Sequence, residues 1–99
     1  MTYIINKKFE NYSSFCNSIK ELKDIYSLSR GIQYILISFV NDEIKGIRKS
    51  TNEEFSIDSK ALYAAYKNLS EVNTVILKKY IFNRAQSPAL AILKTLKVI

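Results

Sequence analysis

Apolar residues in the first third of the chain recur every three or four positions, the spacing of one face of an amphipathic helix. Asn11 is a suitable N-cap and Gly31 a suitable stop signal. We therefore predict a helix of about four turns over residues 11–29, preceded by a brief strand over residues 2–6. The apolar face of this helix consists of Tyr12, Phe15, Ile19, Leu22 and Tyr26.

The pattern changes to that of strands in the middle of the chain. Residues 32–40 form a nearly unbroken apolar run, which predicts a central strand covered on both faces. Residues 43–50 predict a second, more polar strand, and the alternation of Phe55 and Ile57 predicts a third. An outer position is expected for the second strand because it carries three basic residues, Lys45, Arg48 and Lys49.

Helical spacing returns after residue 58. Asp58 or Ser56 is expected to cap a helix that has Leu62, Ala65, Tyr66 and Leu69 on one face. Residues 70–73 end this helix. Residues 74–82 suit a short helix better than a strand, although their β-branched content leaves the strand open.

Ser87-Pro88 predicts an N-cap followed by proline at the first helical position. The last helix is then expected to run to the end of the sequence. Its inward-facing residues would be Ala89, Ile92, Leu93 and Leu96, with Lys94 and Lys97 facing out.

Together these elements predict a single α+β domain over residues 1–99. A small, mainly antiparallel sheet is packed by the N-terminal helix in a β-α-β-β-β part (1–57), and a three-helix C-terminal subdomain forms a basic helical part (58–99). The predicted core comprises Phe15, Ile19, Leu22, Ile35, Ile37, Phe39, Leu62, Leu77 and Leu93.

Composition narrows the classes of protein. The hydrophobic fraction of 47% is enough for a core, and one cysteine with no histidine excludes an internal disulfide and a Cys/His zinc site. Cys16 is expected to be a small apolar filler. No apolar run approaches the roughly 18 residues of a membrane span, and the first eight residues lack the pattern of a secretory signal. We therefore expect a cytoplasmic protein without a membrane partner.

The charge is distributed unevenly along the chain. The net charge is +6, yet residues 1–58 hold eight basic and eight acidic side chains. Residues 59–99 hold seven basic side chains and a single acidic one, Glu71. Because a bias towards lysine codons would not remove acidic residues from one half, this asymmetry favours an anionic partner.

Enzyme motifs are scarce. Histidine, the usual side chain for proton transfer near neutral pH, is absent. One pattern, Glu43-Ile-Lys45 and Asp58-Ser-Lys60 with Asp42 nearby, resembles the spacing in metal-dependent nucleases of the PD-(D/E)xK type. A hairpin turn and a helix cap explain the same carboxylates, so a nuclease is the remote alternative, and we expect no catalytic residue, metal or cofactor.

The C-terminal half resembles a helix-turn-helix in outline, with helices over 59–69 and 74–82 joined by 70–73. Residues 83–87 lead into a helix N-terminus, whose free amides suit a phosphate. The predicted nucleic-acid-binding residues are Lys67, Thr74, Lys78, Lys79, Tyr80, Arg84, Gln86 and Ser87. The alternative is a helical layer packed on the sheet, with its lysines in solvent.

The sequence therefore predicts a small non-enzymatic protein that binds DNA or RNA through a basic C-terminal face. A protein-binding module, such as an inhibitor, immunity factor or regulator from a mobile element, is the alternative. Tyr3, Tyr63 and Tyr80 are the aromatic residues expected to be exposed for that role. The oligomeric state is left open.

Overall fold

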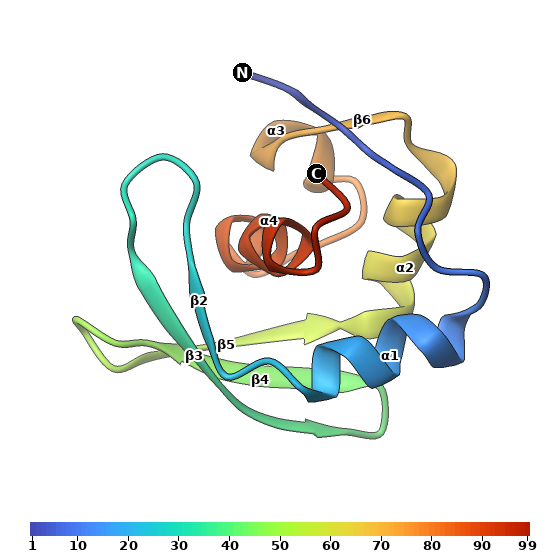
Figure 1. Cartoon of the computed structure of the whole chain (residues 1–99). Helices are drawn as coiled ribbons and strands as arrows, with labels where there is room; N and C mark the ends of the chain where they lie inside the picture. Colours follow the sequence, from blue (N-terminus) through green and yellow to red (C-terminus); the bar gives the residue numbers. More distant parts are fainter.

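The computed structural model describes all residues, 1–99, and is an α+β fold with two antiparallel sheets (Figure 1). The larger sheet has the strand order β2-β3-β4-β5, and the smaller one pairs β1 with β6. The predicted fold class is confirmed. The elements in chain order are β1 (Tyr3–Ile4), α1 (Tyr12–Lys20), β2 (Asp24–Tyr26), β3 (Gln33–Val40), β4 (Glu43–Arg48), β5 (Glu53–Asp58), α2 (Ser59–Asn68), β6 (Glu71–Val72), α3 (Thr74–Leu77) and α4 (Gln86–Thr95).

Helix α4 lies at the centre of the molecule, between the larger sheet and α3 (Figure 1). Every residue from Pro88 to Leu93 is buried, as expected for a helix that is apolar on all sides. α4 makes the most extensive helix–sheet contact, over β2, whereas α1 packs mainly against α2. One core cluster of 21 buried residues runs from Ile5 to Val98 and joins both halves of the chain.

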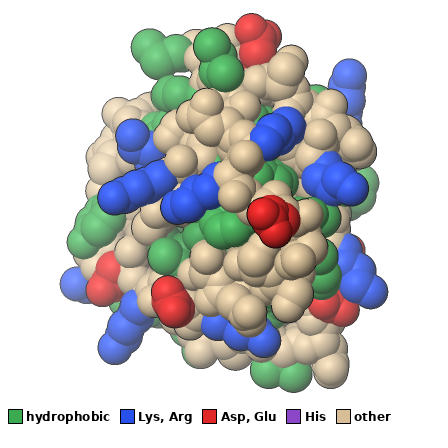
Figure 2. Space-filling view, turned by 45° about the vertical axis from the view of Figure 1, so that its right-hand side comes forward, with side chains coloured by type: hydrophobic (Ala, Val, Ile, Leu, Met, Phe, Trp, Pro, Cys, Tyr) green, Lys and Arg blue, Asp and Glu red, His purple; other side chains and the backbone are tan.

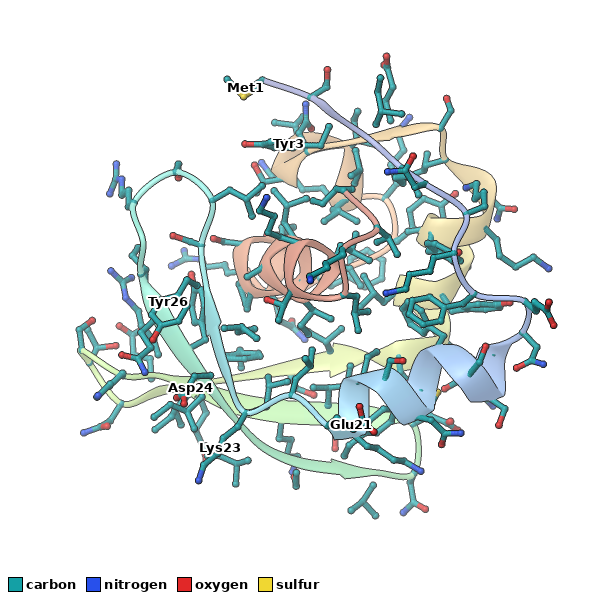
Figure 3. The ribbon with its side chains drawn as sticks, in the orientation of Figure 1. Met1, Tyr3, Glu21, Lys23, Asp24 and Tyr26 are labelled. Carbon is teal, nitrogen blue, oxygen red and sulfur yellow. The ribbon has the colours of Figure 1, made fainter.

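The first helix is shorter than predicted. It begins as expected at Tyr12, where Asn11 forms a capping box with Ser14, but it ends at Lys20. The prediction of a helix to residue 29 is wrong, because Asp24–Tyr26 instead pairs with β3 and places Ile25 opposite Tyr34, fully buried. Figure 3 shows the chain passing from α1 into β2 through Glu21, Lys23 and Asp24. Pairing with a neighbouring strand has overridden the local helical pattern.

Strand β3 is central in the sheet but is covered on only one face. All four helices lie on one side of the sheet (Figure 1), and Ile37 and Val40 on β3 are 61% and 63% exposed. Placing Ile37 in the core was therefore wrong. A bulge between Leu36 and Ser38 contributes, because it shifts the register so that Phe39 pairs with the buried Ile44.

The order of the remaining strands also differs from the prediction. β4 is internal, between β3 and β5, and β5 is the edge strand. The expected outer position of β4 was wrong. Basic side chains project from the faces of a sheet, so they do not prevent the backbone of β4 from pairing with a strand on each side. Side chains alternate between the faces of a sheet, so an internal strand can expose a charge such as Lys45 on an uncovered face.

The C-terminal half keeps three helices but not a helix-turn-helix. Asp58 caps α2, accepting from the backbone N–H of Lys60, which confirms one of the two predicted caps. Residues 70–73 contain β6, which pairs with β1. α3 is helical, as favoured, but has only one turn, Thr74–Leu77, capped by Asn73. The helix-turn-helix outline is thus wrong, because a strand separates α2 from α3 and α3 is too short to act as a recognition helix.

Two lysines near the N-terminus hold helix ends in place. The Lys7 ammonium donates to the carbonyls of Tyr66 and Leu69 at the end of α2, the latter at 2.7 Å. The Lys8 ammonium donates to the carbonyl of Leu96 at the end of α4, at 3.2 Å. Cations at helix C-termini satisfy unpaired carbonyls and oppose the helix dipole. These lysines therefore have a structural role.

No helix in the structure has the length and apolar character needed to cross a membrane.

Candidate anion-binding site

A cleft of about 670 Å³ lies between one end of the larger sheet, where β4 ends and β5 begins, and the segment that runs from α3 to the start of α4. Its walls come from the β2–β3 loop, the adjoining ends of β4 and β5, and the segment from α3 into α4. The chain has twelve lysines but only three arginines, and all three, Arg30, Arg48 and Arg84, line this cleft together with Lys78. We call this the arginine cleft.

Each arginine is positioned by a different part of the backbone. Arg30 lies in the β2–β3 loop directly before Gly31, whose φ of 62° gives the turn a left-handed residue. Arg48 ends β4, beside Tyr34 on β3 and Glu53 on β5. Arg84 lies in the tight connection to α4 and has a φ of 60°. Residues distant in sequence are thus brought to one place by the hairpins and by this connection.

The four cations lie at two depths. Arg30, Lys78 and Arg84 are exposed, whereas Arg48 is half-buried. The Nε atom of Arg48 is fully buried and has no hydrogen-bond partner in the protein. A buried polar atom without a partner is costly, and such atoms are rare in folded proteins. The deepest cation of the cleft is therefore left with an unused donor.

The N-terminus of α4 opens into the same cleft, since Gln86, Ser87 and Pro88 line it. Ala85 is the N-cap and no side chain caps the helix, so the backbone N–H groups of Gln86 and Ser87 have no partner. The prediction that Ser87 is the N-cap is wrong. The Ser87 hydroxyl instead accepts a hydrogen bond of 3.1 Å from the Tyr34 hydroxyl on β3. The helix dipole adds partial positive charge at this end.

No cation of the cleft forms an ion pair with a carboxylate of the protein. Glu53 and Glu54 also line the cleft, but the ion pairs within 4.0 Å are Lys45–Glu43 and Lys60–Asp42, both elsewhere. Four cations against two carboxylates leave an excess of two positive charges. A guanidinium group can donate two parallel hydrogen bonds to two oxygens of one carboxylate or phosphate, so this arrangement can hold a phosphate.

Five of the eight predicted nucleic-acid-binding residues line the arginine cleft: Thr74, Lys78, Arg84, Gln86 and Ser87. The other three do not. Lys67 lies at the end of α2 with its ammonium 5.8 Å from the centre of the Tyr63 ring. Lys79 is exposed outside the cleft, and Tyr80 lines a separate hollow.

Arg30 and Arg48 were missed by the sequence analysis. Counting charge by halves made residues 1–58 appear balanced, which concealed two basic residues that fold against the C-terminal half. A usable signal was present, because arginine is rare in this lysine-rich chain. Three scattered arginines could have been tested as one group.

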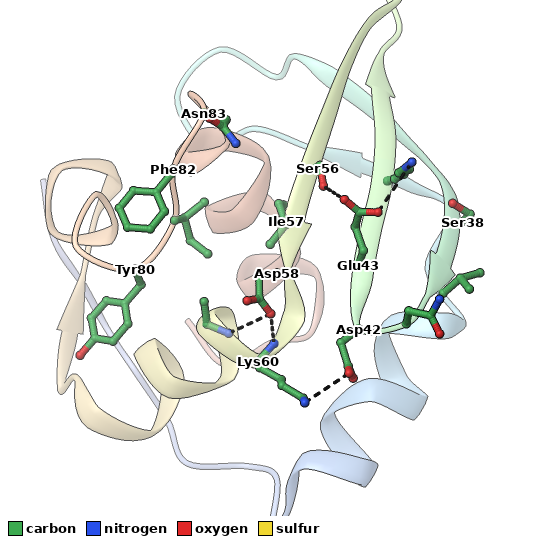
Figure 4. Close-up of a pocket in the computed structure, with 15 residues that line it drawn as sticks. Ser38, Asp42, Glu43, Ser56, Ile57, Asp58, Lys60, Tyr80, Phe82 and Asn83 are labelled. Carbon is green, nitrogen blue, oxygen red and sulfur yellow. Dashed lines mark hydrogen bonds and ion pairs between the residues drawn. The ribbon is translucent and has the colours of Figure 1, made fainter.

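The separate hollow, of about 760 Å³, contains the carboxylates of the nuclease-like pattern (Figure 4). Asp42 accepts a 2.6 Å hydrogen bond from the Tyr12 hydroxyl and lies 3.4 Å from the Lys60 ammonium. The hydrogen bond from Tyr12, and then the charge of Lys60, hold the pKa of Asp42 below its usual value. Asp58 accepts from backbone N–H groups at the start of α2.

Glu43 is engaged in the same way. It accepts a 2.6 Å hydrogen bond from the Ser56 hydroxyl, which lowers its pKa, and lies 3.7 Å from the Lys45 ammonium. No group of three or more His, Cys, Asp or Glu side chains is placed to hold a metal ion. The carboxylates of the hollow therefore have structural partners, and their geometry adds no support to the nuclease hypothesis.

Basic side chains on an open surface are interspersed with other side-chain types. Figure 2 shows lysine and arginine side chains spread across one face, with apolar and acidic side chains between them. Convergence of side chains from several segments distinguishes the arginine cleft from such a surface. No protein-family model, curated protein or solved structure matches the chain. Fold and cleft together define an α+β protein with a concave, positively charged site.

Proposed function

We propose that this protein binds DNA or RNA by holding phosphate groups in the arginine cleft, as a binding protein rather than an enzyme. The observation that carries the proposal is the convergence of all three arginines and Lys78 on one cleft. Arginine forms paired hydrogen bonds with phosphate oxygens and stays charged at any working pH. Free amides at the start of α4 add further donors.

The overall charge supports the same partner. A net charge of +6 attracts a polyanion over long range, and the cleft would provide the contacts at short range. Phosphate contacts release counterions, so the affinity should fall as salt rises, with a slope of roughly −0.9 per contact on duplex DNA. A change in this slope when residues of the cleft are replaced would separate binding carried by the cleft from general attraction.

The test compares two triple variants that remove the same charge from exposed positions. One replaces Arg30, Lys78 and Arg84 with glutamine. Its matched control replaces lysines outside the arginine cleft, Lys23, Lys79 and Lys94, with glutamine. Binding is measured by fluorescence anisotropy with labelled duplex and single-stranded oligonucleotides at several salt concentrations.

We expect the cleft variant to lose at least tenfold in affinity and to flatten the salt slope by roughly 2 to 3, and the control to change little. The single variants Lys78→Gln and Lys79→Gln sharpen the comparison, because these neighbours differ in whether they line the cleft. Equal losses in the two triple variants, or no binding at low salt, would overturn the proposal.

A second candidate, binding of a protein, is favoured by the uncovered face of the larger sheet. Ile37 and Val40 on β3 are 61% and 63% exposed, and exposed apolar patches often mark protein interfaces. A second copy of the chain is the partner that purified protein can test. Sedimentation of the wild type and Ile37→Ser should then show a concentration-dependent dimer only in the wild type, and a wild-type monomer at all concentrations would remove self-association.

A further inference from the structure

We infer that the arginine cleft is a seat for a terminal phosphate monoester, carried by a strand end or by a free nucleotide. This inference rests on the proposed function, since it assigns a ligand to the same cleft. It goes further because the phosphates within an uninterrupted strand are diesters, with different charge, donor needs and access.

The first argument is depth. Arg30, Lys78 and Arg84 are reachable from the rim, but Arg48 is half-buried and its Nε is fully buried. An internal phosphate carries the chain onward in two directions, so it must pass through the cleft with both neighbours. A terminal phosphate has a single ester link and can enter end-on, which brings it to Arg48.

The second argument is the number of donors. The cleft offers three guanidinium groups, the Lys78 ammonium and the free N–H groups of Gln86 and Ser87. A diester has two non-bridging oxygens, whereas a monoester has three strongly accepting terminal oxygens. The larger acceptor set uses more of these donors, including the guanidinium group of Arg48, which lines the cleft and is half-buried.

The third argument is charge. Four cations and the carboxylates of Glu53 and Glu54 leave an excess of two positive charges in the cleft. A phosphate monoester carries about −1.5 to −2 at neutral pH, and a diester carries a single negative charge. The cleft volume of about 670 Å³ lies within the range of small-molecule sites, so it accommodates a nucleotide as well as its phosphate.

The test measures anisotropy for one single-stranded oligonucleotide prepared with a 5′ phosphate, with a 3′ phosphate or with neither. The label is placed at the end opposite to the phosphate. Inorganic phosphate, a nucleoside monophosphate and the matching nucleoside are added as unlabelled competitors. We expect a phosphorylated end to raise the affinity at least tenfold, and the monophosphate but not the nucleoside to compete.

The residue that should carry this preference is Arg48. Arg48→Lys keeps the charge but removes the guanidinium fork, and Arg48→Gln removes both; thermal melts verify that each variant folds. Both variants should reduce the preference for a phosphorylated end, while binding of the unphosphorylated oligonucleotide changes less. If both variants keep the full preference, the assignment of the monoester to the arginine cleft is overturned.

A pH series adds an independent readout. The second pKa of a phosphate monoester is about 6, and the chain has no histidine, the side chain that ordinarily titrates there. The preference for a phosphorylated end should therefore decline below about pH 6. Glu53 and Glu54 line the same cleft as the four cations. The unphosphorylated oligonucleotide, measured at each pH, is the control for any effect of these two carboxylates on binding.

The outcomes separate the two proposals. Equal affinity with and without a terminal phosphate overturns this inference and leaves nucleic-acid binding standing. Binding of the nucleoside monophosphate in isothermal titration calorimetry, without binding of any oligonucleotide, supports the monoester seat and overturns nucleic-acid binding. A preference for one phosphorylated end identifies a strand end as the source, and no binding of any probe overturns both.

Discussion

Gly46→Ala probes the closest packing within the larger sheet. A Cβ atom at Gly46 would lie 2.5 Å from Cζ of Phe55 and 2.6 Å from the carbonyl oxygen of Ile35. The Phe55 ring could move, but the Ile35 oxygen belongs to the neighbouring strand. Overpacking of this kind costs about 1–3 kcal/mol, and the lower chain entropy of alanine returns roughly 0.4–1 kcal/mol. Because the Ile35 contact is with a backbone atom, the cost should lie in the upper part of that range, about 2–3 kcal/mol. After a return of up to about 1 kcal/mol, we expect a net loss of about 1–2 kcal/mol.

In a domain of this size that loss corresponds to a fall in Tm of about 5–15 °C, measured by circular dichroism on heating. In a Phe55→Leu background the cost of Gly46→Ala should shrink, because one of the two contacts is relieved. Gly31→Ala is the control, since nothing lies within 4 Å of its Cβ position and its cost comes only from a φ of 62°. An unchanged Tm in Gly46→Ala would refute the close approach.

Three further predictions concern stability. Leu93→Ala should cost about 2–5 kcal/mol by urea denaturation and Ile37→Ala less than about 1 kcal/mol, because Leu93 is fully buried and Ile37 is 61% exposed; similar losses would contradict the uncovered sheet face. Lys97→Gly should raise the free energy of unfolding by about 0.5–1 kcal/mol, since Lys97 directly follows Leu96, the C-cap of α4, and has a φ of 63° that suits glycine. A loss of stability would show that the side chain of Lys97 matters more. The pKa of Asp42 is lowered by its hydrogen bond from Tyr12, so its ionised form stabilises the fold above about pH 4, and this stabilisation is lost as pH falls through the folded pKa. Asp42→Asn should therefore make the free energy of unfolding less dependent on pH in the acid range. An unchanged dependence would exclude this contribution.

Local signals in the sequence located the helix starts that depend on near neighbours. Asn11 and Asp58 were identified as caps, and both accept backbone N–H groups within the next three residues. The prediction of a cap at Ser87 failed because the helix begins two residues earlier, with Ala85 as its N-cap, and the Ser87 hydroxyl is bound to Tyr34, a partner 53 residues away. Local caps can be predicted when no distant group competes for the same side chain.

Errors in the fold arose where the outcome depended on which elements pack together. Residues 24–26 have helical spacing but become a strand because β3 offers a partner. Ile37 has the apolarity of a core residue but is exposed because no helix covers that face. Neither choice is encoded in the segment itself, so periodicity could not decide it.

The candidate site was only half visible in the sequence for a similar reason. Lys78 and Lys79 are the same residue type in adjacent positions, yet Lys78 lines the arginine cleft and Lys79 does not. Both lie in the turn that follows α3, where only the folded backbone decides which way each side chain points. Arg30 and Arg48 join the cleft through the hairpins of the larger sheet. The basic character could be predicted, whereas its convergence required the fold.

The most direct test of the arginine cleft follows from the small number of arginines. In a ¹⁵N-labelled sample, the arginine Nε–Hε region of the NMR spectrum should contain three signals, all from the cleft. On titration with a 5′-phosphorylated single strand, we expect the three arginine signals and the backbone amide signals of Gln86 and Ser87 to shift with one common Kd. The backbone amide signal of Lys79 should change little. Saturable binding that moves other residues and leaves the three arginine signals in place would contradict the central claim.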